Sequence, residues 1–200
     1  MAKFLLWPKQ VYESGLIFYK AQLFMDVILV DENDVPTGTM EKLEVHQKAL
    51  LHRAFSIFIF NSNGEMLLQK RSANKYHSPS LWTNTCCSHP APGQVIEQAA
   101  AKRLMEEMGF TTRLEKVFEF IYKAQFDNGL TEHEYDHVFT GLYDDVIIPD
   151  KSEVSDYCFQ TLDAIATSLQ LHPEQYTEWF KIAFPKLQAY LACNKAGTGY

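Results

Sequence analysis

Two apolar runs of strand length constrain the fold of this chain more than any other feature of its sequence. Residues 24–30 (FMDVILV) and 54–60 (AFSIFIF) are rich in β-branched and aromatic residues, as strands are. After the second run, Asn63-Gly64 supplies the positive φ angles of a hairpin turn, and MLLQKR follows. The sequence therefore predicts a β-sheet that includes a hairpin.

The clearest helix is predicted over residues 94–108. Its apolar residues recur at near-helical spacing, and Gly109 is a natural C-terminal stop. Downstream, residues 114–126 and 130–142 form two predicted strands joined by a turn at 127–129. A second hairpin therefore follows the helix.

The remaining elements are shorter or less regular. Residues 81–89 look extended, residues 157–161 suit another strand, and the C-terminal third is predicted to be helical. Pro173 suits a helix start, whereas Pro185 is expected to kink a helix. We therefore predict an α/β (α+β) fold with a mixed sheet between helices. It forms a single domain over residues 1–200, with a short N-terminal extension and a loose C-terminal tail (NKAGTGY).

Composition limits the partners and the compartment of the protein. A chain of 200 residues that is 46% hydrophobic can bury one substantial core. Its formal charge of −7 argues against a nucleic acid or an anionic membrane as the main partner. The first apolar patch, in MAKFLLWPKQ, is too short for a signal peptide or a membrane span, and four cysteines without a C-x-x-C pair do not form a disulfide framework. We expect a cytoplasmic protein, monomeric or homodimeric.

Three histidines and two glutamates are candidate metal ligands. His46, His52 and His89 lie beside strand signals, and Glu132 and Glu134 share one face of a predicted strand because strand side chains alternate. Two carboxylates on one face repel unless a cation or a proton separates them, and imidazoles with carboxylates suit a divalent metal. The alternative is a solvated, charged strand face with unrelated histidines.

The predicted helix ends in an acidic pair, Glu106 and Glu107, where the helix dipole disfavours negative charge. Lys102 and Arg103, four residues earlier, could pair with them as ordinary salt bridges. Alternatively, one of the glutamates could hold Mg²⁺ beside a diphosphate, because Mg²⁺ binds through one or two carboxylates plus phosphate oxygens.

Cationic residues and one cysteine complete the candidate site. Lys42, Arg71 and Lys75 could supply the local positive field that an anionic ligand needs, although each alone could be a surface residue. Cys87 could be a reactive thiol or a small buried residue, and the adjacent Cys86 should point to the opposite face.

Several separated motifs together resemble one enzyme family. These are TMEKLEVHQKALLHRAFS, LLQKRS followed by YHSPSLWTNTCCSHP, the glutamate-terminated helix, and TEHEYDHVF, within about residues 20 to 185. They resemble type I isopentenyl-diphosphate Δ-isomerase, a member of the Nudix superfamily, and they match in order and spacing. The resemblance implies an isomerase of isoprenoid biosynthesis that interconverts isopentenyl and dimethylallyl diphosphate.

The resemblance also assigns roles to residues. The implied ligands of a buried divalent metal (Mn²⁺, Zn²⁺ or Mg²⁺) are His46, His52, His89, Glu132 and Glu134. Glu107 would bind the Mg²⁺ that meets the diphosphate, and the implied diphosphate contacts are Lys42, Arg71 and Lys75. Cys87 and Glu134 would transfer protons, with Tyr122 on the acidic side and Trp179 facing the cationic carbon.

The chain departs from the Nudix hydrolase pattern. Where those hydrolases carry a glycine, a glutamate and an Arg-Glu pair, this sequence has Ser88, Gln94, Lys102 and Arg103. Too few carboxylates remain to assemble the metal cluster that activates a hydrolytic water. A Nudix pyrophosphohydrolase acting on a nucleoside diphosphate derivative is nevertheless the nearest alternative, and a non-catalytic metal-binding domain is a third.

The implied reaction explains why these groups would be needed. Shifting the double bond of an unactivated alkene adds one proton and removes another, through a tertiary carbocation that water would trap. The pocket must therefore be closed, with an aromatic face such as Trp179 near the cation and a proton-transfer group on each side.

Overall fold

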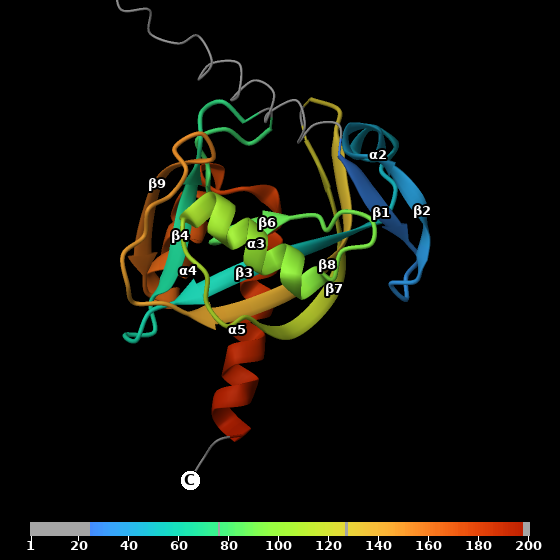
Figure 1. The fold of residues 1–200 in the computed structure, drawn as a ribbon. Coiled ribbons are helices and arrows are strands. Elements are labelled where there is room, and N and C mark those ends of the chain that lie inside the picture. The colour runs from blue at the N-terminus through green and yellow to red at the C-terminus, as the bar shows by residue number, and fades with distance from the viewer. Residues whose placement is uncertain (1–24, 76, 127, 198–200) are drawn as a thin grey trace, which may run out of the picture.

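The computed structural model describes residues 25–75, 77–126 and 128–197, with side chains described up to residue 194. The expected N-terminal extension therefore lies outside the described residues. Most of the described chain forms a nine-stranded, curled, mixed sheet with helices on both sides (Figure 1). The strands are β1 (Asp26–Val30), β2 (Pro36–Glu41), β3 (His52–Phe60), β4 (Met66–Arg71), β5 (Trp82–Thr83), β6 (Cys86–Ser88), β7 (Glu115–Gln125), β8 (Thr131–Leu142) and β9 (Val154–Gln160).

Strand β3 organises the sheet. It pairs antiparallel with β1, β4 and β6, and parallel with β8 over its whole length, from His52 opposite Glu134 to Phe60 opposite Leu142. The two predicted hairpins are present as β3–β4, which turns at Gly64 (φ 74°), and as β7–β8. Because β6 and β8 both border β3, segments about 45 residues apart in sequence meet along one strand.

The apolar side chains of β3 divide between two cores. Phe55, Ile57 and Ile59 pack with helix α3 (Ile96–Met108) on one face of the sheet. Phe58 faces the other way, toward α4 (Leu162–Leu171) and α5 (Glu178–Gly197). Burial on both faces explains why the run reads as continuously apolar rather than alternating. The predicted arrangement of a mixed sheet between helices is confirmed.

Several predicted boundaries differ in detail. Helix α3 begins at Ile96 rather than Gln94, and the extended segment 81–89 is split into β5 and β6. Pro173 opens a short 3₁₀ helix, η1 (Pro173–Gln175), and Pro185 lies inside α5. Helix α5 continues to Gly197, so residues 194–197 are helical rather than loose.

Two elements were not predicted: β2 and the short helix α2 (Lys42–Lys48). The side chain of Glu41 caps α2 by accepting hydrogen bonds from the backbone N–H groups of Leu43 and Glu44. Ala49 ends the helix in the left-handed conformation, with φ at 53°. A helix of seven residues is too short to show a clear hydrophobic periodicity in the sequence. This helix nevertheless carries both Lys42 and His46.

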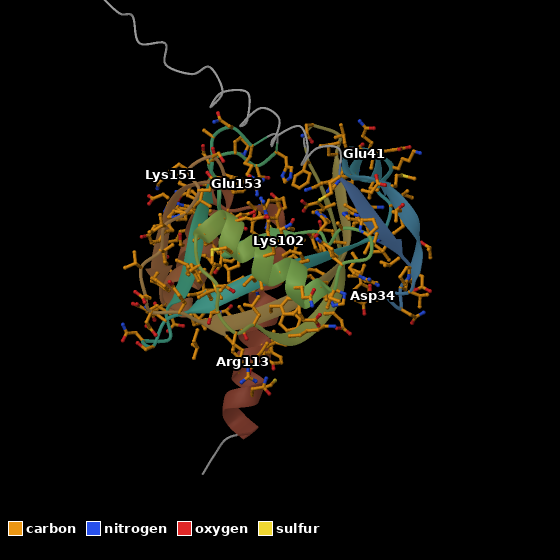
Figure 2. All side chains as sticks on the ribbon, in the orientation of Figure 1. Asp34, Glu41, Lys102, Arg113, Lys151 and Glu153 are labelled. Atoms are coloured by element: carbon orange, nitrogen blue, oxygen red, sulfur yellow. The ribbon has the colours of Figure 1, made fainter. Side chains whose placement is uncertain are left out.

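Charged side chains mark the outer surface. Figure 2 shows Asp34 and Glu41 at the end of the molecule formed by β1 and β2, and Lys102 on the outward side of α3. Within the described residues, we find no helix that combines the length and the apolar character needed to cross a membrane.

Candidate active site

Four buried side chains from four elements converge on one point. They are His46 from α2, His52 at the start of β3, His89 just after β6, and Glu134 on β8, and one potential ligand atom of each lies within 4.8 Å of the others. The Nε2 atom of His89 is 2.9 Å from Oε1 of Glu134 and 3.1 Å from Nε2 of His52. A three-histidine, one-carboxylate group of this kind suits a divalent metal.

Backbone carbonyls orient two of these imidazoles. The Nδ1 atom of His46 lies 2.5 Å from the carbonyl oxygen of Lys42, and Nδ1 of His52 lies 2.9 Å from that of Leu50. Because a carbonyl only accepts, each Nδ1 carries the proton and each Nε2 keeps a lone pair. Nε2 of His46 is buried and has no hydrogen-bond partner among the described residues, as expected of a metal ligand. The residues present therefore fit a metal.

The surroundings of these four residues shift their pKa values toward the forms that bind a metal cation. Burial, together with the charge of Lys42, lowers the pKa of His46 to about 4 and that of His89 to about 3. Burial alone would raise the pKa of Glu134, but its interactions with the neighbouring imidazoles of His52 and His89 outweigh burial and hold the pKa well below its usual range. Neutral imidazoles and an ionised carboxylate are the forms that bind metal.

Glu132 lies beside this group and outside the four convergent residues. Its Oε2 lies 3.1 Å from the Tyr122 hydroxyl oxygen, and this hydroxyl donates its one proton to Oε2 of Glu134 at 2.6 Å. Burial, and then the charge of Glu134, raise the pKa of Glu132 well above its usual range. Tyr122 therefore bridges one protonated and one ionised carboxyl group, and the assignment of Glu132 as a ligand stays a prediction.

A pocket of about 710 Å³, including its open mouth, adjoins these carboxylates. Its walls are formed by Lys42, Phe55, Ser56, Arg71, Lys75, His77, Cys87, Ser88, His89, Arg103, Glu107, Tyr122, Glu132, Glu134 and Trp179.

The two adjacent cysteines of β6 face opposite ways, as predicted. Cys86 is fully buried in the core beneath α3, whereas Cys87 lines the pocket. Burial raises the pKa of Cys87 above its ordinary value, so the group is a neutral thiol at physiological pH. Cys87 pairs with Ser56 on one border of β3, and Glu134 pairs with His52 on the other. The thiol and the carboxylate thus reach one pocket from either side of β3.

Four cationic side chains line the same pocket: Lys42, Arg71, Lys75 and Arg103. Arg71 is held by the backbone carbonyls of Ser78 and His77, at 3.1 and 3.2 Å. Its guanidinium carbon also lies 5.0 Å from the ring centroid of Trp179. This contact joins the cationic part of the pocket to its aromatic wall.

The acidic end of α3 forms salt bridges and also borders the pocket. Arg103 donates to Glu107 at 2.7 Å and Lys102 lies 3.7 Å from Glu106, so both predicted salt bridges form. Arg103 also contacts Glu106 at 3.3 Å. Glu107 is nevertheless buried, accepts a hydrogen bond from Gln69 at 2.9 Å, and lines the pocket. Burial opposes ionisation of Glu107, but the charges of Arg103, Lys75 and Arg71 and the hydrogen bond from Gln69 together outweigh burial and lower the pKa.

The pocket wall also contains residues that the sequence does not mark as functional, among them Arg103 and His77. Arg103 is predicted only as a partner of the helix-end glutamates, although its spacing from Glu107 places both on one face of α3. His77 packs edge-on against Trp179, with ring centroids 5.6 Å apart, and stacks on Phe126 at 5.5 Å. His77 lies within the motif YHSPSLWTNTCCSHP, and that motif is the sequence signal that could have marked it.

Comparison with known proteins places the chain in a family. The NUDIX domain matches residues 50–180. The isopentenyl-diphosphate Delta-isomerase of Pectobacterium atrosepticum is 52% identical over 171 residues, covering 86% of this chain and 96% of that protein. The chain belongs to the isopentenyl-diphosphate Δ-isomerase family. Another member, isopentenyl-diphosphate Delta-isomerase 2 of Photorhabdus laumondii, is 52% identical over 78% of this chain and 88% of its own length.

Solved structures place this isomerase family member in the Nudix fold. The crystal structure of DR0079 from Deinococcus radiodurans matches with a TM-score of 0.68 at 16% identity, covering 80% of this chain and 98% of that one. A MutT protein from Methanosarcina mazei matches with a TM-score of 0.58 at 19% identity, covering 72% and 96%. At such identities the likeness concerns the fold alone, and it confirms the predicted Nudix-like architecture.

Proposed function

We propose that this protein interconverts isopentenyl diphosphate and dimethylallyl diphosphate by adding one proton and removing another. The observation that carries the proposal is the placement of Cys87 and Glu134 in one pocket, on strands at either side of β3. Relatives named as isopentenyl-diphosphate isomerases, which match most of the chain, support the same reaction.

The diphosphate would occupy the cationic part of the pocket. Lys42, Arg71, Lys75 and Arg103 offer four positive groups there, and Glu107 adds a carboxylate for Mg²⁺. Mg²⁺ held by one carboxylate and by phosphate oxygens is the usual arrangement for such ligands. The hydrocarbon part of the substrate would then extend toward Cys87, Tyr122 and Trp179.

A second divalent ion, Mn²⁺, Zn²⁺ or Mg²⁺, would be held by His46, His52, His89 and Glu134, with Glu132 beside them. When bound, this ion would supply positive charge that fixes the Glu134 carboxylate and increases the acidity of groups bonded to it. The short bond from Tyr122 to Glu134, 2.6 Å, gives that side of the pocket a hydroxyl and a carboxylate that share a proton.

The residues then divide the two proton transfers. The Tyr122–Glu134 pair handles one proton, and the Cys87 thiol handles the other from the opposite side of the substrate. The buried indole of Trp179 would stabilise the tertiary cation between these steps, which is worth up to about 2 kcal/mol at a desolvated site. Burial also excludes the water that would trap the cation.

Incubation with isopentenyl diphosphate in heavy water tests the proposal. We expect deuterium in the dimethylallyl diphosphate product and no release of phosphate. Glu134→Gln and Cys87→Ala should each remove the exchange, while Cys87→Ala retains bound metal. Rapid phosphate-anhydride cleavage of nucleoside diphosphate derivatives without deuterium incorporation would instead identify a Nudix pyrophosphohydrolase.

A further inference from the structure

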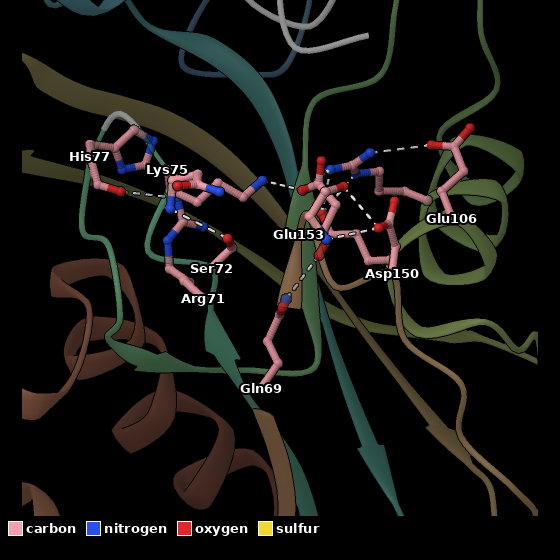
Figure 3. A network of polar contacts seen from close by, with 12 residues as sticks. Gln69, Arg71, Ser72, Lys75, His77, Glu106, Asp150 and Glu153 are labelled. Carbon is pink, nitrogen blue, oxygen red and sulfur yellow. Dashed lines mark hydrogen bonds and ion pairs between the residues drawn. The ribbon is translucent and has the colours of Figure 1, made fainter. Parts of the chain in front are cut away.

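One carboxylate lies between two of the pocket cations. A single oxygen of Glu153, Oε2, accepts a bond from Nζ of Lys75 and another from Nη2 of Arg103, the latter at 2.8 Å. All three side chains are largely buried, each about 15% exposed. Figure 3 shows Glu153 between the loop that carries Lys75 and the helix end that carries Glu106.

Glu153 contacts these cations from behind. Lys75 and Arg103 both line the pocket, whereas Glu153 does not. An anionic ligand entering the pocket would therefore meet the two cations first. The carboxylate behind them would remain in place without touching the ligand.

The backbone of Glu153 is also fixed to both cation-bearing segments. Its carbonyl accepts a hydrogen bond from the N–H of Ser72 at 2.9 Å, at the start of the loop that carries Lys75. Its own N–H donates to the carbonyl of Asp150 at 3.0 Å, and the N–H of Asp150 donates to the carbonyl of Glu107 at 2.9 Å. The turn from Asp150 to Glu153 thus links that loop to the C-terminal end of α3.

We propose that Glu153 is a positioning residue for the diphosphate, which holds Lys75 and Arg103 side by side at the pocket wall. Two positive side chains that bind the same carboxylate oxygen lie close enough to repel each other in a buried setting, and the negative charge of that carboxylate offsets the repulsion. Fixing both side chains before binding removes part of the entropy loss that ordering them would otherwise impose on the complex. This inference rests on the proposed function, because it concerns the diphosphate end of the same substrate.

Positioning and simple charge balance predict opposite results for Glu153→Gln. Removing a negative charge near an anion site would by itself tighten anion binding. If Glu153 acts by positioning, the variant instead binds inorganic pyrophosphate with Mg²⁺ about tenfold more weakly. It also shows a comparable rise in KM for isopentenyl diphosphate, with kcat within about threefold of wild type, because the proton-transfer groups are untouched. Unchanged or tighter pyrophosphate binding overturns the proposal.

Two further variants separate this role from general folding effects. Glu106→Gln is the matched control, because Glu106 also contacts Arg103, at 3.3 Å, but lies outside the pocket and has a 40% exposed side chain. It should keep KM within about twofold. In a double-mutant cycle, the effects of Glu153→Gln and Lys75→Met should be less than additive, since both remove the contact between Lys75 and Glu153, while the contact with Arg103 is lost only in Glu153→Gln. Full additivity would contradict the proposal, and Glu153→Asp replaces Glu153→Gln if the latter does not fold.

Pyrophosphate binding keeps the two hypotheses distinguishable. A wild-type protein that binds pyrophosphate but does not isomerise isopentenyl diphosphate would disprove the proposed function. The weaker pyrophosphate binding of Glu153→Gln would still be expected in that case. An active isomerase whose pyrophosphate binding is insensitive to Glu153→Gln would disprove the positioning role alone.

Discussion

Cys86 and Cys87 are adjacent on one strand, yet one thiol lies in the core and the other lines the pocket. Strand side chains alternate, so in β6 the first thiol enters the core beneath α3 and the second enters the pocket. Burial raises the pKa of both thiols. The two residues therefore share a strand and a protonation state, and differ only in whether substrate can reach them.

This difference predicts opposite effects for two alanine variants. Cys87→Ala should lower kcat by about 10²-fold or more, as expected for loss of a general acid–base group, with the free energy of unfolding close to wild type. Cys86→Ala should lower the free energy of unfolding by about 1 kcal/mol through a small cavity, with kcat retained. Steady-state kinetics and urea titration measure both effects. Equal loss of turnover in the two folded variants would refute this assignment.

The convergence of His46, His52, His89 and Glu134 predicts metal-dependent stability. Adding Zn²⁺ or Mn²⁺ to chelator-treated protein, at 100 times its Kd, should stabilise the fold by about 2.7 kcal/mol. For a chain of this size, that corresponds to a rise in Tm of roughly 5–10 °C. Differential scanning calorimetry provides the measurement.

The control for this metal prediction is a histidine elsewhere on the chain. His52→Ala should remove most of the Tm shift, because its Nε2 faces both His89 and Glu134. His172→Ala should keep the full shift, because His172 is exposed at the end of α4. A shift that survives in His52→Ala would place the ion elsewhere.

At the scale of elements, predictability followed length and burial. Helix α3 has thirteen residues, five of them buried on one side, and β3 contains the long apolar run 54–60, interrupted only by Ser56, so both elements were predicted from the sequence. Helix α2 has seven residues and is capped by a glutamate, which is not a typical N-cap residue. Contacts within the folded molecule hold α2 in place, and no local pattern reveals them.

The end of α3 gives a stability prediction with an internal control. Gly109 has φ at +76°, and a Cβ there would lie 2.1 Å from the carbonyl oxygen of Ile148. Gly93 has φ at +80° with no atom within 4 Å of an added Cβ. Gly93→Ala should therefore destabilise by about 1–2 kcal/mol, the cost of the left-handed conformation alone. Gly109→Ala should destabilise by several kcal/mol, because backbone must also move.

Urea denaturation of the two alanine variants compares these costs directly. The difference between them isolates the clash with Ile148, because the backbone conformation of the two glycines is nearly the same. Equal destabilisation would mean that the 148 segment moves freely away from α3.

In the whole molecule, long-range partners mark the limit of sequence reasoning. Lys42, His46, His52, Cys87, His89 and Glu134 belong to the quoted motifs, so their residue types and spacing could be recognised from the sequence. Glu153 and Asp34 lie in turns, and their partners are distant in sequence: Arg103 is 50 residues from Glu153, and His137 is 103 residues from Asp34. Only the folded sheet brings such pairs together.

Asp34, in the turn between β1 and β2, connects this hairpin to the rest of the sheet. Its carboxylate accepts a bond from Arg53 of β3 at 2.7 Å and contacts His137 of β8 at 3.0 Å. Glu119 of β7 approaches the other ring nitrogen of His137 at 4.0 Å. Residues of three strands and of the β1–β2 turn thus lie around one buried imidazole, so its protonation should affect the stability of this part of the sheet.

The pKa of His137 predicts how stability changes with pH. Burial is the largest influence and lowers the pKa; Lys116 lowers it further, Arg53 contributes slightly in the same direction, and the raising effects of Asp34 and Glu119 are smaller. Below about pH 6.5, the unfolded chain takes up a proton that the folded protein does not. The free energy of unfolding therefore decreases as the pH is lowered, by up to about 1.4 kcal/mol per pH unit for each such proton.

His137→Gln removes the side chain that takes up this proton in the unfolded chain. The variant should therefore lose less stability than wild type when the pH is lowered from 7 to 5.5. Urea titrations at both pH values measure the two losses, and His172→Gln, at an exposed position, controls for deleting a histidine. If His137→Gln instead lost as much stability as wild type, or more, Asp34 and Glu119 would outweigh burial and hold the imidazole in its charged form. The contact between Asp34 and His137 would then be a true ion pair that strengthens, rather than weakens, as the pH falls.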